Sequence, residues 1–543
     1  MGINWRRFRP LTGLLLGGLL WRAMIAWTLP AGFDEVYYYL YSRHLSWSYF
    51  DHPPMVALTT GVGWWLTGVI TPLTIRLGAL LLHCVSLGLL YLAATHLYGR
   101  RTGLIAAAIS TLVPLFWIGF GVLTSPDNSL LLFWGLVLYG AAVEFFPHHQ
   151  QVRLGDGQGL TYRPTWRLAL IGMGLGLAAL SKYHGFVLGL GLLGFCLTRR
   201  RTQTILRSPW MGLAVILGLL ALTPLWLWNS HHDWISFRFH LFMRFDGGEP
   251  RPYRVLDALV TGLIGVAYLW PTLGFPLWWV AGRRGWRQLI ALLQPPLSAV
   301  EAYSRDRDAL ILWVSLPIAL GFTLLGGKQQ IYPAWPAPGL WGLTVLLAHS
   351  VSHWRPISLR RWLGGSGVAI GIICTIALLH LSLGILQKPG NYSLTGGFIP
   401  VEQDGSTTLL NVTQLRHRLA EKPAVLNAIQ QSDFVFTDEF YLSGYVDMAL
   451  HPLSGLPVTC FSQDPRGFAF WFNPDAWVGE TAVYVTLKSL HPNPVEATAA
   501  YERFFEGLIP IGEIELTRGG VTTETVLFYQ AQTMTQAYSY PYG

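Results

Sequence analysis

Long apolar runs recur along this chain of 543 residues and limit the folds that it can adopt. A helix that crosses a bilayer needs about 20 mostly apolar residues. Eleven runs approach this length, near residues 10–29, 75–98, 103–122, 128–146, 166–180, 184–198, 210–228, 256–280, 309–325, 339–350 and 364–386. Charged residues make up only 12% of the chain, against about 25% in ordinary soluble domains. The sequence therefore predicts a polytopic α-helical membrane protein with about eleven spans.

Clusters of arginine alternate with aromatic and polar loops between the apolar runs. The clearest clusters lie at residues 5–9, 99–101, 199–201, 282–287 and 355–361. Because arginine-rich loops stay in the cytoplasm, the net charge of +8 indicates membrane topology and not a nucleic-acid partner. The pattern predicts a cytoplasmic N-terminus on an uncleaved first span, with the other loops facing outward.

The composition changes after about residue 388, where long apolar runs end and polar residues become common. The segments "TAVYVTLK" and "TVLFYQAQ" are typical of strands, and "DFVFTDEFYLSGYVDMAL" of a strand followed by a helix. We therefore expect two parts, a transmembrane catalytic domain at 1–387 and a small extracytoplasmic α/β domain at 388–543. Residues 54–68, with Pro-Pro, Gly and Thr, are expected to lie along the membrane interface.

The segment "FDEVYYYLYSRHLSWSYFDHPPM", residues 33–55, follows the first apolar run. It holds Asp34, Glu35, Asp51 and His52 among many aromatic residues. Ionisable groups in or beside a membrane are costly and are therefore functional candidates. The alternative for Asp34 and Glu35 is structural, because acids are favoured at a helix N-terminus.

Two further candidates occur in outward loops. Asp127 lies in "LTSPDNSLLLFW", where it also suits ordinary helix capping. Lys182 interrupts an apolar stretch in "LAALSKYHGFVLGL", with Tyr183 beside it. One explanation for Lys182 is structural, because a lysine side chain can extend to the membrane interface. The other is functional, because its ammonium can act as a point charge that binds a lipid-borne phosphate.

His240 and Arg244 are spaced by four residues, so a helix would place them on one face. His240 and Asp51 are candidate ligands of a divalent metal, although two residues do not specify a metal. The four scattered cysteines do not form a zinc motif. No glycine-rich loop follows a predicted strand, which argues against a soluble nucleotide-sugar enzyme.

Together these segments resemble the lipid-sugar-dependent glycosyltransferases of the GT-C fold. The chain is most similar to the family of protein O-mannosyltransferases and bacterial aminoarabinose transferases that act on lipid A. The matching pieces occur in the family's order over roughly the first 250 residues, namely "FDEVYYYLYSRHLSWSYFDHPPM", "LTSPDNSLLLFW", "GLGLAALSKYHG" and "TPLWLWNSHHDWISFRF".

The resemblance implies a role for each residue of the first two segments. Asp34 takes the place of the catalytic acid in the first outward loop, and Asp127 matches a second outward acid. Asp51 stands where the aminoarabinose transferases have a glutamate implicated in metal contact. His52 stands where they have a lysine that contacts the donor phosphate, and Glu35 is assigned to the same substrate site.

The later segments resemble the rest of the family's cavity. Lys182 corresponds to a lysine near the lipid phosphate, with Tyr183 beside it, and His240 and Arg244 correspond to a His and an Arg that face the cavity. A metal remains optional, because a monophosphate donor carries less charge than a nucleotide-diphosphate sugar.

The resemblance implies an inverting glycosyltransferase of the inner membrane. It would move a sugar from a polyprenyl-phosphate donor to a hydroxyl of a glycolipid, lipid-linked glycan or protein, and one carboxylate base suffices for that reaction. The alternative is a transporter or lipid-sugar flippase, which would also place ionisable groups along a membrane cavity. The absence of an evident inverted repeat and the clustering of polar residues on one face argue against it.

Overall fold

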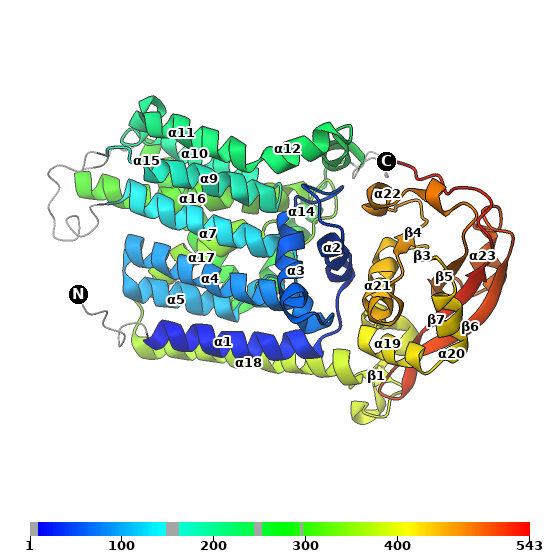
Figure 1. The fold of residues 1–543 in the computed structure, drawn as a ribbon. Coiled ribbons are helices and arrows are strands. Elements are labelled where there is room, and N and C mark those ends of the chain that lie inside the picture. The colour runs from blue at the N-terminus through cyan, green and yellow to red at the C-terminus, as the bar shows by residue number, and fades with distance from the viewer. Residues whose placement is uncertain (1–8, 148–161, 244–251, 294–295, 297, 543) are drawn as a thin grey trace.

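Apolar helices form a bundle over most of the first 383 residues (Figure 1). The computed structural model describes residues 9–147, 162–243, 252–293, 296 and 298–542. The bundle forms because backbone amides and carbonyls within lipid must be satisfied inside each helix. Its main helices are α1 (Arg9–Thr28), α4 (Pro72–Tyr98), α5 (Arg100–Leu112), α7 (Pro126–Phe145), α9 (Arg167–Ser181), α10 (Gly185–Thr198), α11 (Pro209–Ala221), α12 (Thr223–Ser230), α14 (Val255–Tyr268), α15 (Pro271–Leu293), α16 (Ala299–Leu325), α17 (Ala337–Val351) and α18 (Pro356–Leu383).

Five helices in the described part of the chain are long and apolar enough to cross a membrane, namely α1, α4, α7, α16 and α18. The pair α11 and α12, bent by 47°, would make a sixth span, and α9, α10, α14 and α17 are shorter apolar helices. Each of the eleven predicted runs contains helix. The run at 256–280, expected as one span, is instead divided between α14 and α15. Pro271 lacks the amide that would continue the helix, and Trp270 before it has a positive φ of 72°.

Two short helices lie across the end of the bundle that faces the C-terminal region (Figure 1). They are α2 (Phe33–Arg43) and α3 (Met55–Thr67). The α3 helix covers most of the segment that was expected along the interface. It packs closely on α4, since a Cβ added to Gly63 would lie 1.9 Å from the carbonyl oxygen of Thr74.

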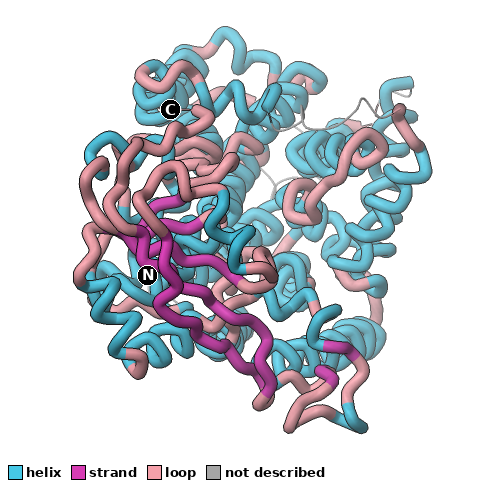
Figure 2. Tube along the Cα trace, turned by 90° about the vertical axis from the view of Figure 1, so that its right-hand side faces the viewer, coloured by secondary structure: helices cyan, strands magenta, loops and turns pink. Residues whose placement is uncertain are grey.

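The C-terminal region, residues 388–542, contains a mixed sheet with strand order β4-β3-β5-β7-β6. Figure 2 looks onto this end of the molecule, where the strands lie in front of the helices. The strands predicted from "DFVFTDEF", "TAVYVTLK" and "TVLFYQAQ" are confirmed as β3, β5 and β7. The strands are β3 (Phe434–Thr437), β4 (Val458–Cys460), β5 (Ala482–Leu487), β6 (Leu508–Arg518) and β7 (Val521–Ala531).

Alternate residues of these strands face opposite sides of the sheet. Phe434 and Phe436 belong to a small aromatic core on one side. Val435 belongs to a larger core that extends across α19 (Val412–Ala420), α20 (Pro423–Gln430) and α21 (Phe440–Ser454) and also includes residues of α2 and α3. The helices at the end of the bundle and the C-terminal region therefore share one hydrophobic core.

The α21 helix is the element through which this region packs on α2. A Cβ added to Gly444 would lie 2.6 Å from the carbonyl oxygen of Val36, so the two helices touch through their backbones. The hydroxyl of Tyr445 donates to the carbonyl of Ala31 at 2.7 Å. These contacts hold the C-terminal region directly over the loop that carries Asp34.

Candidate active site

Asp34 occupies the first turn of α2. Its side chain is accessible to solvent, whereas the residues that follow it along α2, from Glu35 to Ser42, are buried. Desolvation by the surrounding protein raises the pKa of Asp34, and the charges of Arg466 and Lys182 oppose that rise. An accessible carboxylate surrounded by protein is the arrangement that a general base requires.

Glu35 anchors the turn that presents Asp34. Its carboxylate accepts hydrogen bonds from Arg76 Nε at 2.8 Å and Arg76 Nη2 at 2.5 Å. The backbone amides of Thr124 and Gly32 donate to it at 2.9 and 2.8 Å. Glu35, predicted to bind substrate, thus has both oxygens engaged within the protein. This geometry favours a supporting role beside Asp34.

Asp127 and Lys182, predicted separately, form a buried ion pair. The Lys182 ammonium lies 3.0 and 2.8 Å from the two carboxylate oxygens. Asp127 is held at the start of α7 and Lys182 at the end of α9, so the pair joins two membrane helices at their ends near α2. The Asp127 side chain is 4% exposed and the Lys182 side chain 10%, so a ligand can reach the lysine only by a narrow route.

Asp51 is a further charged residue of the site. It forms an ion pair with a residue of the C-terminal region. Arg466 Nη1 lies 3.0 Å from Asp51 Oδ2, and the Tyr41 hydroxyl also donates to this carboxylate. Burial alone would raise the pKa of Asp51, but the charges of His52 and Arg466 and the hydrogen bond from Tyr41 together lower it.

The three predicted acids all act electrostatically on one phenol, that of Tyr38. Desolvation raises the pKa of Tyr38 well above its ordinary value, and the charges of Asp34, Asp51 and Asp127 add to the rise. The charge of Arg466 opposes this rise. All three carboxylates therefore act on the same buried phenol, although they belong to segments that are far apart in sequence.

The histidines of the prediction lie beside this group. His240 Nε2 is 2.7 Å from the backbone oxygen of Asp51, and the His240 ring lies 6.2 Å from that of His52. Tyr183 packs on His240 with ring centroids 4.7 Å apart. Arg244, predicted as the partner of His240, lies outside the described residues.

A metal site is not evident in this geometry. His240 meets the carbonyl of Asp51 and not its carboxylate, which faces the cation of Arg466. No group of three His, Cys, Asp or Glu side chains within the described ranges is placed to hold a metal ion. The two residues predicted as ligands do not fit a divalent ion as they stand, so no chemistry is assigned to one.

Arg466 is the functional candidate that the sequence did not reveal. Its guanidinium is also centred 4.0 Å from the ring centroid of Phe440, and its Nε lies 3.3 Å from Asp464 Oδ2. The residue has a positive φ of 46°, and the next amide, that of Gly467, donates to the Tyr37 hydroxyl at 2.9 Å. The only signal in the sequence was the aromatic segment "GFAFWF" that follows it in an otherwise ordinary soluble region.

Sequence comparisons find glycosyltransferases that are similar to this chain. Residues 51–228 match the family described as dolichyl-phosphate-mannose-protein mannosyltransferase. The lipid A galacturonosyltransferase RgtD of Rhizobium johnstonii is 28% identical over 372 residues, which are 66% of this chain and 70% of RgtD. These relatives are transferases, which favours an enzyme over the transporter alternative.

The fold is shared with ArnT from Cupriavidus metallidurans. The crystal structure of ArnT in the apo state gives a TM-score of 0.58 at 16% identity, and that bound to undecaprenyl phosphate gives 0.59 at 15%. Each alignment covers 95% of this chain and 97% of ArnT. The likeness extends over both the helix bundle and the C-terminal region.

Proposed function

We propose that this chain is a membrane glycosyltransferase of the ArnT and protein mannosyltransferase type, and that it transfers one sugar from a polyprenyl-phosphate donor to a glycolipid. The acceptor is of the lipid A class, and the anomeric carbon is inverted by a single displacement. The ArnT complex with undecaprenyl phosphate supports the donor class, and the lipid A specificity in the name of RgtD supports the acceptor.

The accessible carboxylate of Asp34 is the observation that carries this proposal. In a single displacement, Asp34 takes the proton of the acceptor hydroxyl while that oxygen attacks the anomeric carbon. The bond from this carbon to the phosphate oxygen breaks, and polyprenyl phosphate leaves. Glu35, held by Arg76, fixes the turn so that Asp34 stays within hydrogen-bonding reach of the hydroxyl.

Negative charge grows on the departing phosphate, and preorganised cations stabilise it most in a poorly hydrated site. Two donors of the Lys182 ammonium point to Asp127, and its third is assigned to the phosphate. The His52 ring packs edge-to-face on Tyr38, with ring centroids 5.6 Å apart. We assign His52, when protonated, to the same phosphate. Asp127 holds the lysine in place.

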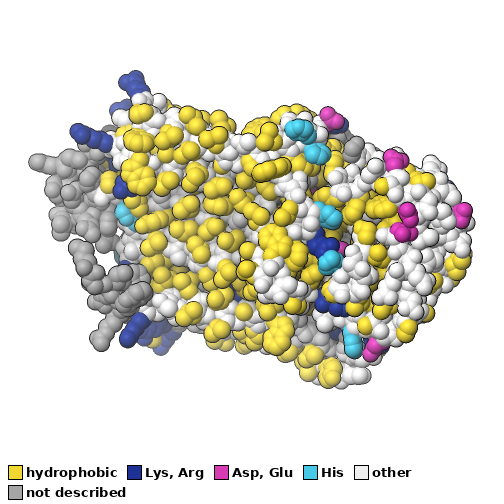
Figure 3. Space-filling view, in the orientation of Figure 1, with side chains coloured by type: hydrophobic (Ala, Val, Ile, Leu, Met, Phe, Trp, Pro, Cys, Tyr) yellow, Lys and Arg dark blue, Asp and Glu magenta, His cyan; other side chains and the backbone are white. Residues whose placement is uncertain are grey.

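The membrane orientation forms part of the same proposal. Figure 3 shows Lys and Arg side chains at the end of the bundle remote from the C-terminal region, and a broad apolar belt between the two ends. By the positive-inside rule, the arginine-rich end is cytoplasmic. The chain then crosses the inner membrane about eleven times, with the short apolar helices included. The site and residues 388–543 lie on the outer side.

A reconstituted assay tests the proposed function. Purified full-length protein in lipid nanodiscs is incubated with lipid A and a panel of polyprenyl-phosphate sugars, and products are identified by mass spectrometry. We expect a mass increase of one sugar on lipid A with one donor. Asp34→Asn should abolish it, while Asp475→Asn, at an exposed carboxylate outside the site, should not. Donor consumption that persists in Asp34→Asn would exclude Asp34 as the base.

A further inference from the structure

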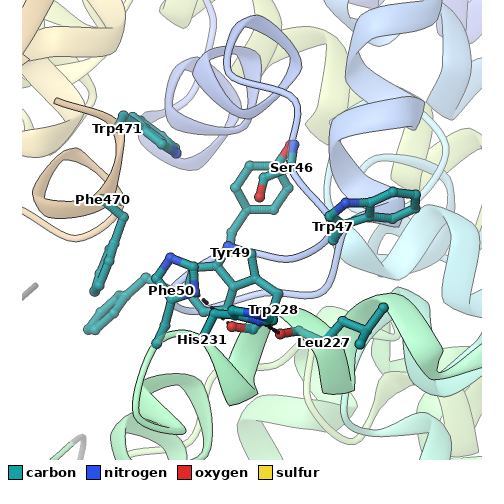
Figure 4. A pocket seen from close by; sticks show the side chains of 11 residues that line it. Ser46, Trp47, Tyr49, Phe50, Leu227, Trp228, His231, Phe470 and Trp471 are labelled. Atoms are coloured by element: carbon teal, nitrogen blue, oxygen red, sulfur yellow. Dashed lines mark hydrogen bonds between the residues drawn. The ribbon is translucent and has the colours of Figure 1, made fainter.

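A cavity of about 370 Å³ lies between the helix bundle and the C-terminal region, and none of its lining residues takes part in the mechanism above. Three separate segments contribute its walls (Figure 4). They are the loop between α2 and α3, the end of α12, and the segment around α22 (Phe468–Trp471). The volume lies within the range of about 300–1,000 Å³ that is usual for small-molecule sites.

Flat rings form these walls, and they are held in place before any ligand binds. Trp228 stacks on His232 with ring centroids 4.0 Å apart and 11° between the planes. Phe470 packs against both rings, at 5.7 and 5.5 Å. Phe50 stacks on Tyr542 at 4.6 Å, with the planes 1° apart. Because these rings are already packed, little conformational entropy is lost when a ligand binds.

The histidines add hydrogen-bond acceptors to the wall. Nδ1 of His231 lies 2.7 Å from the carbonyl of Leu227, and Nδ1 of His232 lies 2.7 Å from that of Trp228. A carbonyl can only accept, so each Nδ1 must carry the hydrogen. In the neutral rings, each Nε2 is then an acceptor. Ser46 adds a hydroxyl to the lining. Aromatic faces with several polar groups suit a molecule that has an apolar face and hydroxyl edges.

The cavity shares a wall with the candidate active site. Tyr49 and Phe50 line it and immediately precede Asp51, and Gly467 lines it and immediately follows Arg466. Among the described residues that line the cavity there is no Lys or Arg, so this lining does not suit the phosphate of the donor. The cation assigned to that phosphate, Lys182, is not among the lining residues; it lies at the end of α9 and pairs with Asp127.

We propose that this cavity binds a sugar ring of the acceptor's headgroup, adjacent to the position that receives the transferred sugar. The assignment rests on the proposed function for the identity of the acceptor. Aromatic rings pack on the apolar face of the pyranose, while the histidine Nε2 atoms accept hydrogen bonds from its hydroxyls. The C-terminal region thereby takes part in acceptor recognition.

Initial-rate kinetics test the proposal, with lipid A and donor varied in turn. Phe470→Ala and His232→Ala should each raise the KM for lipid A by about tenfold, the effect of losing about 1.4 kcal/mol of binding. The KM for the donor and kcat should stay within about twofold of wild type. Phe470→Tyr, which keeps the ring, should behave as wild type. Phe398→Ala, at an exposed ring elsewhere in the C-terminal region, is the matched control.

An unchanged KM for lipid A in both variants, or a rise confined to the KM for the donor, would overturn the proposal. A direct measurement of ligand binding distinguishes a wrong assignment of the cavity from a wrong proposed function. Saturation-transfer NMR with the deacylated glucosamine disaccharide of lipid A should show contact with wild type and a weaker signal with Phe470→Ala. Binding without transfer by wild type would refute the proposed function alone. No binding to wild type would refute the cavity's assignment.

Discussion

Removing the Arg466 guanidinium should destabilise the protein, because it leaves the Asp51 carboxylate buried without its cation. Asp51 is 3% exposed, and breaking a buried ion pair costs about 3–5 kcal/mol. Arg466 itself is 25% exposed, and Asp51 keeps its hydrogen bond from Tyr41. We therefore expect Arg466→Met to lower the free energy of unfolding by about 3 kcal/mol, the lower end of that range.

The assay is denaturant unfolding of the purified protein in mixed micelles. Asp51→Asn and the double variant complete a double-mutant cycle, and the double variant should cost clearly less than the sum of the single variants. Arg503→Met is the matched control. Its guanidinium lies 4.6 Å over the ring of Phe504 and forms no ion pair with a carboxylate in the described part of the chain. The substitution should change stability by less than about 0.5 kcal/mol.

The same substitution should also shift the dependence of activity on pH. Desolvation raises the pKa of Asp34, and the Arg466 charge opposes that rise, so removing the charge raises this pKa further. The base is then protonated at a higher pH, and the acidic limb of kcat/KM moves to higher pH. Arg466→Lys, which keeps a positive charge, should restore the limb toward its wild-type position.

Two results would refute this reasoning. A loss below about 1 kcal/mol in Arg466→Met would mean that the pair behaves as an exposed one. An acidic limb that stays in place in Arg466→Met would mean that Asp34 is not the group that titrates in the rate.

Three further predictions concern other parts of the site. Asp34→Asn should lower turnover by about 10²- to 10⁴-fold with no change in thermal midpoint, since the side chain is accessible; activity above a tenth of wild type would contradict its role. Lys182→Met should destabilise the fold by about 3 kcal/mol, because Asp127 stays buried without a cation, and adding Asp127→Asn should recover most of the loss in denaturant unfolding. Burial lowers the pKa of His44 to about 4, below its ordinary value of about 6.5. The unfolded chain therefore binds the proton first, and stability contributed by neutral His44 is lost as pH falls from 6.5 through 4. His44→Phe should make the thermal midpoint less dependent on pH in that window, and an unchanged slope would exclude His44.

The sequence was sufficient to predict the helices. Backbone amides and carbonyls in lipid must form hydrogen bonds within the chain, so an apolar run of this length folds as a helix in almost any context. It also identified Asp34, Asp127 and Lys182 one by one, since ionisable groups stand out among apolar residues. The alternation of spans and loops predicted that the three residues lie on the same side of the membrane. In the structure, Asp127 and Lys182 form an ion pair, and Lys182 acts on the pKa of Asp34.

The pairings within the site could not be predicted from the sequence. Arg76 lies inside the run at 75–98, so its bond to Glu35 depends on how α4 packs against α2. Arg466 is separated from Asp51 by 415 residues, and it lies in a turn that is typical of any soluble domain. Ion pairs of this kind are set by tertiary packing, which leaves no local periodicity to detect.

The hydrophobic core that joins α2 and α3 to the C-terminal region has a consequence for biogenesis. The segment with Asp34 is synthesised well before Val435 and Tyr445, which belong to the core that supports it. A nascent polypeptide that lacks the C-terminal region therefore lacks the support for the segment with Asp34. We expect such a chain to be unable to carry out the proposed transfer.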